Sequence, residues 1–201
     1  MITRLITSLR VRGGRLLTVP IRRRLGRQIT ALDRQGYALV ANNCVAGLLY
    51  EMAGLPKRTP TAGLFFRDDA FATFLDALAD DGLDAWPPVS ADTLGVDPAS
   101  GRPAIFRAGK PAVVFLHYAD PAQAADKWNA RLPRLAGRRI VVIASLRDGL
   151  EQNMLTHVQR RFAHLFVIGP SPAPPADEVI LQLWLLRRLS AFLDEVILDD
   201  R

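Results

Sequence analysis

The sequence contains a single cysteine, Cys44, among 201 residues. One cysteine cannot form an intrachain disulfide, so nothing in the sequence points to an oxidising compartment. A zinc site built from several thiolates is excluded too, because it needs more than one cysteine. Hydrophobic residues make up 49% and charged residues 23% of the chain, which is an ordinary globular composition. A chain of this length can bury a core without disulfides.

Long apolar runs are also missing. No stretch reaches the roughly 18 apolar residues that a membrane-spanning helix requires. Arginines at positions 4, 10, 12 and 15 interrupt the N-terminus, so it lacks the apolar core of about 7–15 residues that a secretory signal needs. We therefore expect a cytoplasmic protein, peripheral on the inner membrane if it contacts one.

Several sequence motifs that identify common enzymes are absent. The chain has no Walker phosphate loop, no Gly-x-Gly-x-x-Gly, no Gly-x-Ser-x-Gly and no His-Glu-x-x-His. It also lacks the Asp-x-Asp pattern of many metal-dependent nucleotide-sugar transferases. These absences count against classical NTPases, dinucleotide enzymes, serine hydrolases and zincins. We predict no cofactor and no metal site.

Acidic residues are scarce at the N-terminal end. Residues 1–34 contain nine arginines and one acid, Asp33, a formal charge of +8; the whole chain carries +6, so the remaining residues sum to −2. A basic segment on a nearly neutral body favours an anionic partner, either a membrane surface or nucleic acid. Nucleic acid ranks lowest, because the body carries no known binding module.

The basic segment, residues 1–35, has helical periodicity. Ile2, Leu5, Ile6 and Leu9 share one face of a short helix. We expect Gly13-Gly14 to end that helix and Pro20 to begin a second one. The first helix is the candidate for contact with an anionic membrane, whereas the apolar positions of the second, between residues 21 and 32, favour packing on the body.

Apolar strands alternate with helical segments in residues 36–201, which we treat as one α/β domain. The predicted strands are 37–41, 112–116, 139–144 and 165–168, and the predicted helices are 44–52, 121–132, 149–161 and 177–198. Residues 82–103 are predicted to be loop. This alternation is typical of βαβ units. We predict a three-layer α/β sandwich with a mostly parallel sheet, preceded by the basic helical segment and closed by a C-terminal helix.

Polar side chains follow several of the predicted strands. In parallel sheets, ligands bind at the carboxyl ends of the strands, so these residues are candidates for one site. Three have the chemistry of nucleophilic catalysis, with a thiol, an imidazole base and an orienting carboxylate: Cys44, His117 and Asp148. Four are candidates for substrate binding: Asn42, Asn43, Tyr118 and Arg147.

Each of these residues also has a purely structural interpretation. Cys44 would lie in the first turn of a helix, where the helix dipole favours a reactive thiolate, yet free cysteines most often fill small core spaces. His117 could be a buried, hydrogen-bonded histidine. Asp148 could cap a helix, and the paired asparagines could satisfy only the backbone of a turn.

Five segments together resemble a bacterial family of exopolysaccharide or capsule biosynthesis proteins of unknown biochemical function. They are Ala41–Gly47 with Tyr50, Gly54–Phe66, Phe115–Tyr118, Ala124–Trp128 with Arg131, and Arg147–Gly149. The chain departs from the family pattern at Ala41 and Val45, and it carries Leu150 where many members have a second cysteine. A mechanism based on two cysteines is therefore not expected.

The resemblance implies an α/β fold and a role in surface polysaccharide production. We expect either a transferase or hydrolase acting on a glycan or sugar intermediate, with Cys44 and His117 at its site, or a non-catalytic protein that binds a sugar or nucleotide-sugar and docks on a polysaccharide synthase. The expected partners are a sugar or glycan substrate, the polysaccharide assembly machinery and, through the N-terminal segment, an anionic membrane surface.

Overall fold

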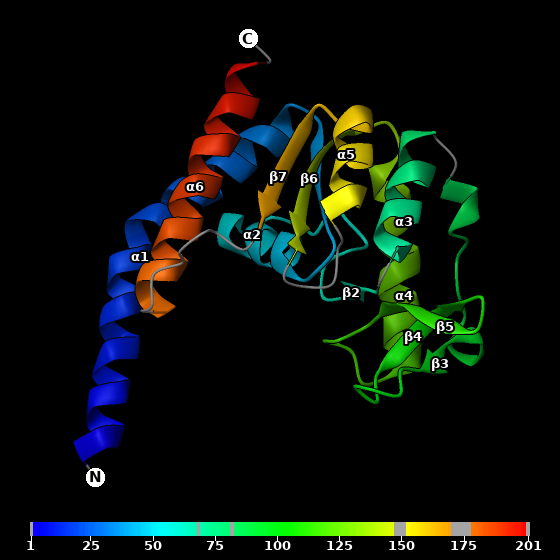
Figure 1. Ribbon diagram of the computed structural model, residues 1–201, viewed down its shortest axis with the longest axis horizontal. Helices are drawn as coiled ribbons and strands as arrows, with labels where there is room; N and C mark the ends of the chain where they lie inside the picture. The colour runs from blue at the N-terminus through cyan, green and yellow to red at the C-terminus, as the bar shows by residue number, and fades with distance from the viewer. Residues whose placement is uncertain (1, 68, 81–82, 147–151, 170–177, 200–201) are drawn as a thin grey trace.

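The structure is a computed structural model that describes residues 2–67, 69–80, 83–146, 152–169 and 178–199. Within these ranges the chain forms a mixed α/β fold of six α-helices, seven strands and three short 3-10 helices (Figure 1). The α-helices are α1 (Ile2–Arg34), α2 (Val45–Ala53), α3 (Ala70–Ala79), α4 (Pro121–Arg131), α5 (Gln152–Arg161) and α6 (Glu178–Leu198). The strands are β1 (Tyr37–Ala41), β2 (Phe65–Phe66), β3 (Gly95–Val96), β4 (Pro103–Arg107), β5 (Lys110–Val114), β6 (Arg139–Ser145) and β7 (His164–Ile168). The 3-10 helices are η1 (Leu83–Ala85), η2 (Ala91–Thr93) and η3 (Leu132–Leu135).

Three strands form a parallel sheet in the order β1-β6-β7. Ala41 pairs with Ile143 and Ser145 pairs with Ile168, so the carboxyl ends of the three strands share one edge. Their sequences are almost entirely apolar, as expected for strands that are covered on both faces. The prediction that these three strands lie in a parallel sheet is confirmed.

The fourth predicted strand does not join this sheet. β5 belongs to a small antiparallel sheet of order β2-β5-β4-β3, so the sheet structure is not mostly parallel. The reason is a tight hairpin in which Ala108 and Gly109 both have positive φ and connect β4 directly to β5. Part of the predicted loop 82–103 also forms η1, η2 and β3. An apolar run alone does not distinguish a parallel strand from an antiparallel one.

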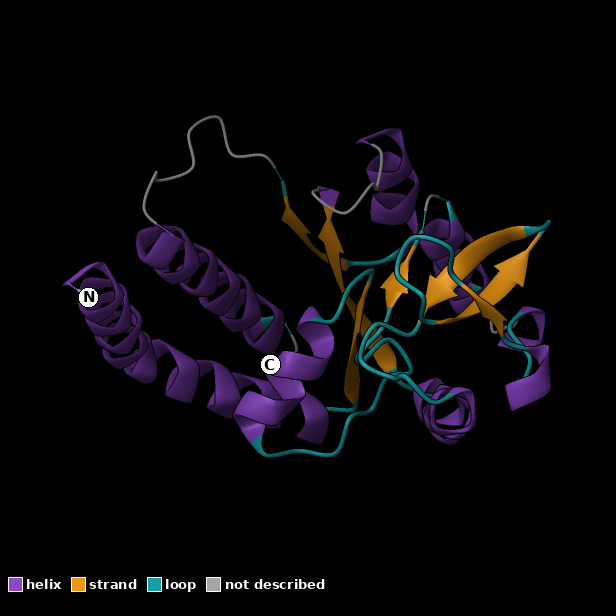
Figure 2. Cartoon of the chain, turned by 90° about the horizontal axis from the view of Figure 1, so that it is seen from below, coloured by secondary structure: helices purple, strands orange, loops and turns teal. Residues whose placement is uncertain are grey.

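Alternate residues of β1 and β6 enter two separate hydrophobic clusters. Leu39 and Ile143 lie in a cluster with side chains of α1, α2 and α6, whereas Val40 and Val142 lie in one with side chains of α3, α4 and α5. Figures 1 and 2 show α1 and α6 together on one side of the parallel sheet, away from the antiparallel sheet. Both faces of the parallel sheet are therefore packed.

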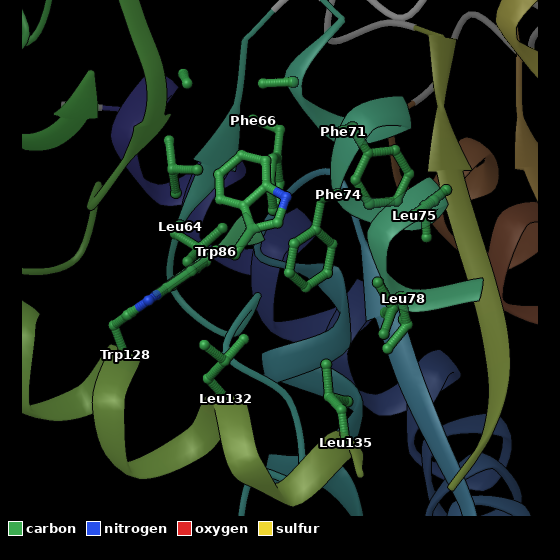
Figure 3. Packing of buried hydrophobic residues seen from close by; sticks show 14 of the residues in the cluster. Leu64, Phe66, Phe71, Phe74, Leu75, Leu78, Trp86, Trp128, Leu132 and Leu135 are labelled. Carbon is green, nitrogen blue, oxygen red and sulfur yellow. The ribbon is translucent and has the colours of Figure 1, made fainter. Parts of the chain in front are cut away.

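Aromatic rings fill the second cluster. Phe66, Phe74, Trp86 and Trp128 are fully buried and come from β2, α3, the residue after η1 and α4 (Figure 3). The Phe74 and Trp86 rings meet edge to face with their centroids 5.4 Å apart, a favourable arrangement for aromatic quadrupoles. This packing attaches the antiparallel sheet to the rest of the domain.

The N-terminal segment is one continuous helix, so the predicted break at Gly13-Gly14 and new start at Pro20 are wrong. Glycine lowers helix propensity by about 1 kcal/mol without removing a hydrogen bond. Pro20 lies inside the helix and lacks one N–H donor. Beyond it, Leu25, Ile29 and Leu32 are buried against α2 and α6, which stabilises the helix. Packing of this part on the body is as predicted.

Gly36 has φ +84 and follows the end of α1, where a left-handed residue stops a helix at little cost. No helix in the described part of the chain is both long enough and apolar enough to span a membrane.

Candidate functional site

Asn42 follows β1 at the carboxyl edge of the parallel sheet, and its side chain is only 1% exposed. Its Nδ2 donates to the Ser145 carbonyl over 2.9 Å, and its Oδ1 accepts from the Ser145 N–H over 2.8 Å. The amide thus connects the ends of β1 and β6 as a backbone ladder would. Its hydrogen-bonding groups are occupied by the backbone, which gives Asn42 a positioning role at this edge.

Asn43 and Cys44 form the turn from β1 into α2. The Asn43 Oδ1 accepts from the Val45 N–H over 3.0 Å, which satisfies a donor at the helix start. Cys44 occupies the N-cap position, is partly exposed, and makes no capping bond with its side chain. The thiol is therefore held beside the positive end of α2, as the sequence pattern predicts.

The segment Thr61–Phe66 passes the carboxyl end of β1. The Thr61 Oγ1 accepts from the Ala41 N–H, and the Phe66 N–H donates to the Asn42 carbonyl over 2.9 Å. A Cβ placed on Gly47 would lie 3.1 Å from the Ala62 Cβ, so α2 approaches this segment closely. Gly47, in the first turn of α2 and three residues after Cys44, is thereby packed against Ala62.

His117 reaches this region by a different route from the one predicted. It follows β5 of the antiparallel sheet and has an exposed side chain, and its N–H donates to the Gly63 carbonyl over 3.2 Å. Gly63 directly follows Ala62, which Gly47 of α2 approaches. His117 and the first turn of α2, which follows Cys44, therefore border the same two-residue segment, Ala62–Gly63, although β1 and β5 belong to different sheets.

Tyr118 is nearly buried and is bonded within the protein. Its hydroxyl donates to the Ala62 carbonyl over 3.4 Å and accepts from the Arg131 Nη1 over 2.9 Å. The same Nη1 donates to the Ala62 carbonyl over 2.9 Å. The Tyr118 hydroxyl thus holds Ala62 and Arg131 in place. Because it is bonded within the protein, its role is to position these residues.

Sequence reasoning placed Arg131 among the residues of the family resemblance but gave it no role at the site. The residue is 9% exposed and lies on the buried face of α4 with Ala124 and Trp128. The spacing 124, 128, 131 is that of one helical face. A charged residue in an otherwise apolar stripe is the sequence signal that could have identified it.

Glu51 lies two turns along α2 from Cys44, and Lys57 donates a hydrogen bond to it over 2.6 Å. That hydrogen bond and the charge of Lys57 lower the pKa of Glu51, and the charge of His117 lowers it further. His117 is thus close enough to Glu51 to act on it electrostatically.

Two of the predicted site residues, Arg147 and Asp148, lie outside the described residues. Within the described ranges, no group of three His, Cys, Asp or Glu side chains is arranged to hold a metal ion. His117, Tyr118, Arg131 and the first turn of α2 after Cys44 lie against the Ala62–Gly63 segment, and Asn42 joins the ends of β1 and β6.

The sequence model of the family described as a domain of unknown function, DUF1919, matches residues 20–162. The match covers more than half of the chain, so this protein belongs to the DUF1919 family. It begins inside α1 and ends just after α5, and so it includes both sheets except β7. A search of curated proteins finds no match.

Proposed function

We propose that this DUF1919 protein takes part in the production of a surface polysaccharide, as a transferase or hydrolase that acts on a sugar or glycan intermediate through Cys44 and His117. One observation carries the proposal: separate segments of the chain converge on Ala62–Gly63. The first turn of α2, which follows Cys44, the backbone of His117, and the side chains of Tyr118 and Arg131 all meet that segment. These are the segments that resemble exopolysaccharide biosynthesis proteins.

The proposed chemistry divides one transfer into two steps. The Cys44 thiolate attacks the anomeric or acyl carbon while the bond to the leaving oxygen breaks, and protonated His117 gives its proton to that oxygen. An acceptor hydroxyl, or water, then attacks the same carbon and releases the sulfur, while its proton returns to His117. The dipole of α2 stabilises the thiolate at the start and at the end of the cycle.

The structure supports these roles in two ways. Cys44 precedes a nine-residue helix whose N-terminal dipole favours an anion. His117 is exposed, whereas the other two histidines are engaged elsewhere: His157 is 2.6 Å from Asp76, and His164 packs edge to face on Tyr37. His117 is therefore the histidine that a bound substrate near Ala62–Gly63 can reach.

The first test is made in the organism that encodes the chain. Deleting the gene should lower cell-surface polysaccharide, and the intact gene should restore it. Genes encoding Cys44→Ser or His117→Ala should not restore it, whereas the matched histidine control His157→Gln should. Full restoration by both site variants would refute the catalytic roles.

The second test separates an enzyme from a binding protein. The purified protein is alkylated at Cys44 and offered nucleotide-linked and lipid-linked sugars, and both turnover and binding are measured. Loss of turnover after alkylation supports the catalytic proposal. Binding without turnover in the untreated protein would instead assign the non-catalytic role of a sugar-binding partner of a polysaccharide synthase.

A further inference from the structure

A cavity of about 390 Å³ lies between the loop after α2 and the end of α4. Its charged lining is entirely basic and consists of Lys57, Lys127, Arg131 and Arg134. The other lining residues are apolar: Leu55, Pro56 and Ala130. A concave surface with four cations and no lining carboxylate favours a ligand with more than one negative charge.

Most of this charge is not neutralised within the protein. Lys57 forms an ion pair with Glu51. Arg134 donates to the Lys57 carbonyl over 2.8 Å, which holds the loop against η3 without cancelling a charge. Over the ranges that the structure describes, no ion pair involves Lys127, Arg131 or Arg134.

Arg131 gives the strongest indication of a ligand. Its guanidinium is permanently charged, yet the residue is 9% exposed and its bonds go to neutral oxygens of Ala62 and Tyr118 through one nitrogen, Nη1. A buried charge without a counterion is costly. An anion in the cavity that Arg131 lines would supply that counterion, and a guanidinium matches phosphate oxygens in pairs.

We propose that this cavity binds a diphosphate group, with Arg131 at its base and Lys57, Lys127 and Arg134 around its opening. A volume of about 390 Å³ is sufficient for the diphosphate itself. The Ala62 carbonyl that accepts from Arg131 belongs to the segment that His117 borders, so a group attached to the diphosphate can extend toward His117. That this group is a sugar rests on the proposed function; the binding of the diphosphate does not.

The same diphosphate chemistry occurs on a soluble nucleoside diphosphate and on a lipid carrier at a membrane surface. Calorimetry with inorganic pyrophosphate and with uridine diphosphate measures the soluble form. Competition by pyrophosphate against binding to phosphatidylcholine vesicles that carry a polyprenyl diphosphate measures the lipid form. Tighter binding of uridine diphosphate than of pyrophosphate supports the soluble source, and displacement from vesicles supports the lipid source.

The decisive variant is Lys127→Gln combined with Arg134→Gln in the full-length chain, because both side chains are exposed and neither is part of the core. The variant should bind pyrophosphate about tenfold or more weakly than the native chain. The matched control is Arg160→Gln, an exposed arginine on α5, and should bind unchanged. The proposal is overturned if the native chain binds neither probe, if the double variant binds as well as the native chain, or if the control is weakened equally.

Two further variants complete the test. Arg131→Lys keeps a positive charge but not the paired donors, so it should weaken pyrophosphate binding if it unfolds at the same urea concentration as the native chain. Unchanged binding by this variant contradicts the assigned role of Arg131. Cys44→Ser should bind pyrophosphate as the native chain does. If the catalytic proposal fails, diphosphate binding should still be observed, so the two proposals can fail separately.

Discussion

Asn42 and Ser145 are joined by two hydrogen bonds in which the Asn42 side chain takes the place of a strand backbone. The β1–β6 ladder ends at the pair Ala41–Ile143, and the side-chain amide of Asn42 joins the two chains beyond that pair. Because both residues are buried, neither of these bonds competes strongly with water. The relationship fixes the point where the chain leaves β1 and turns toward Cys44.

Replacing Asn42 with alanine should therefore destabilise the protein. The change leaves the N–H and carbonyl of Ser145 buried without those partners, and we expect a loss of about 2–4 kcal/mol in the free energy of unfolding. Urea denaturation followed by circular dichroism measures it. The control Asn43→Ala removes the bond to the Val45 N–H at a partly exposed turn and should lower stability by only about 0.5–1 kcal/mol. Equal losses in the two variants would contradict the bridging role of Asn42.

Gly26 allows α1 to lie directly on α2. A Cβ at this position would be 2.6 Å from the Met52 carbonyl oxygen, which is backbone and cannot rotate away. Gly26→Ala should therefore move the helices apart and lower stability by about 1–3 kcal/mol. Gly36→Ala is the comparison, because a Cβ there meets nothing within 4 Å and only the positive φ opposes it.

The two glycine variants should differ both in how much stability they lose and in whether the helix packing changes. Gly36→Ala should lower the thermal midpoint by a small amount and leave the packing unchanged. Gly26→Ala should in addition expose apolar surface between α1 and α2, which increased binding of a hydrophobic dye would detect. A Gly26→Ala protein with native stability and no added dye binding would show that the close contact is not needed.

The buried Asp97 should make the protein sensitive to acid. Burial raises its pKa, but hydrogen bonds from Ser100 and Arg67 and the charge of Arg67 outweigh burial and lower it overall. A carboxyl whose pKa is lower in the folded chain than the unfolded value of about 3.9 adds stability above that value. This stability is lost as the pH falls through the folded pKa.

Comparing Asp97→Asn with the native chain tests this pH dependence. The variant should unfold at lower urea concentration at pH 7, and the difference should shrink as the pH is lowered below about 4. Asp126→Asn, at an exposed position on α4, is the matched change of charge and should behave as the native chain does. A difference that stays constant from pH 7 to pH 3 would exclude Asp97 as the cause.

The sequence was sufficient where a local pattern determines the structure, and insufficient where a distant contact does. The strands at 37–41, 139–144 and 165–168 are apolar on both faces, and they form the parallel sheet as predicted. The strand at 112–116 has the same composition, but the hairpin at Ala108-Gly109 assigns it to another sheet. Composition does not encode that choice.

The candidate site shows the same division. The helix predicted at 44–52 is present as α2, with Cys44 at its N-cap and Gly54 ending it at φ +65. The role of Asn42 depends on Ser145, which is more than a hundred residues away in the chain. The basic cavity combines the loop after α2 with α4. No spacing rule along the sequence could bring these two elements together.

The basic surface of α1 is the proposed contact with an anionic membrane. A groove of about 650 Å³ between α1 and α2 is lined by Arg23, Arg27 and Arg34, and in the described part of the chain none of the three is in an ion pair. A second groove also lies between α1 and α2, and it is lined by the exposed apolar side chains Val19 and Leu48. Arginines next to exposed apolar groups are the composition that binds the headgroup region of anionic bilayers.

Two full-length variants divide this surface by position along α1. One replaces the arginines of the first half with glutamine, at positions 4, 10, 12 and 15. The other replaces Arg22, Arg23 and Arg27, which lie where α1 meets the body. Flotation with vesicles containing phosphatidylglycerol measures binding, and each basic side chain near such a surface contributes about 1 kcal/mol. Either variant should therefore float much less than the native chain at low salt.

Shortening the chain shows which half of α1 binds the vesicles, and raising the salt shows whether the binding is electrostatic. If the first half is the anchor, a chain that starts near Thr18 should lose flotation as fully as the first variant does. Binding should weaken with salt, because exposed charges are screened beyond about 10 Å at 0.1 M. Arg160→Gln, far from α1 in sequence, should float like the native chain. Equal flotation of the native and shortened chains would refute the first half of α1 as the anchor. The membrane contact as a whole is refuted if the native chain does not float at low salt.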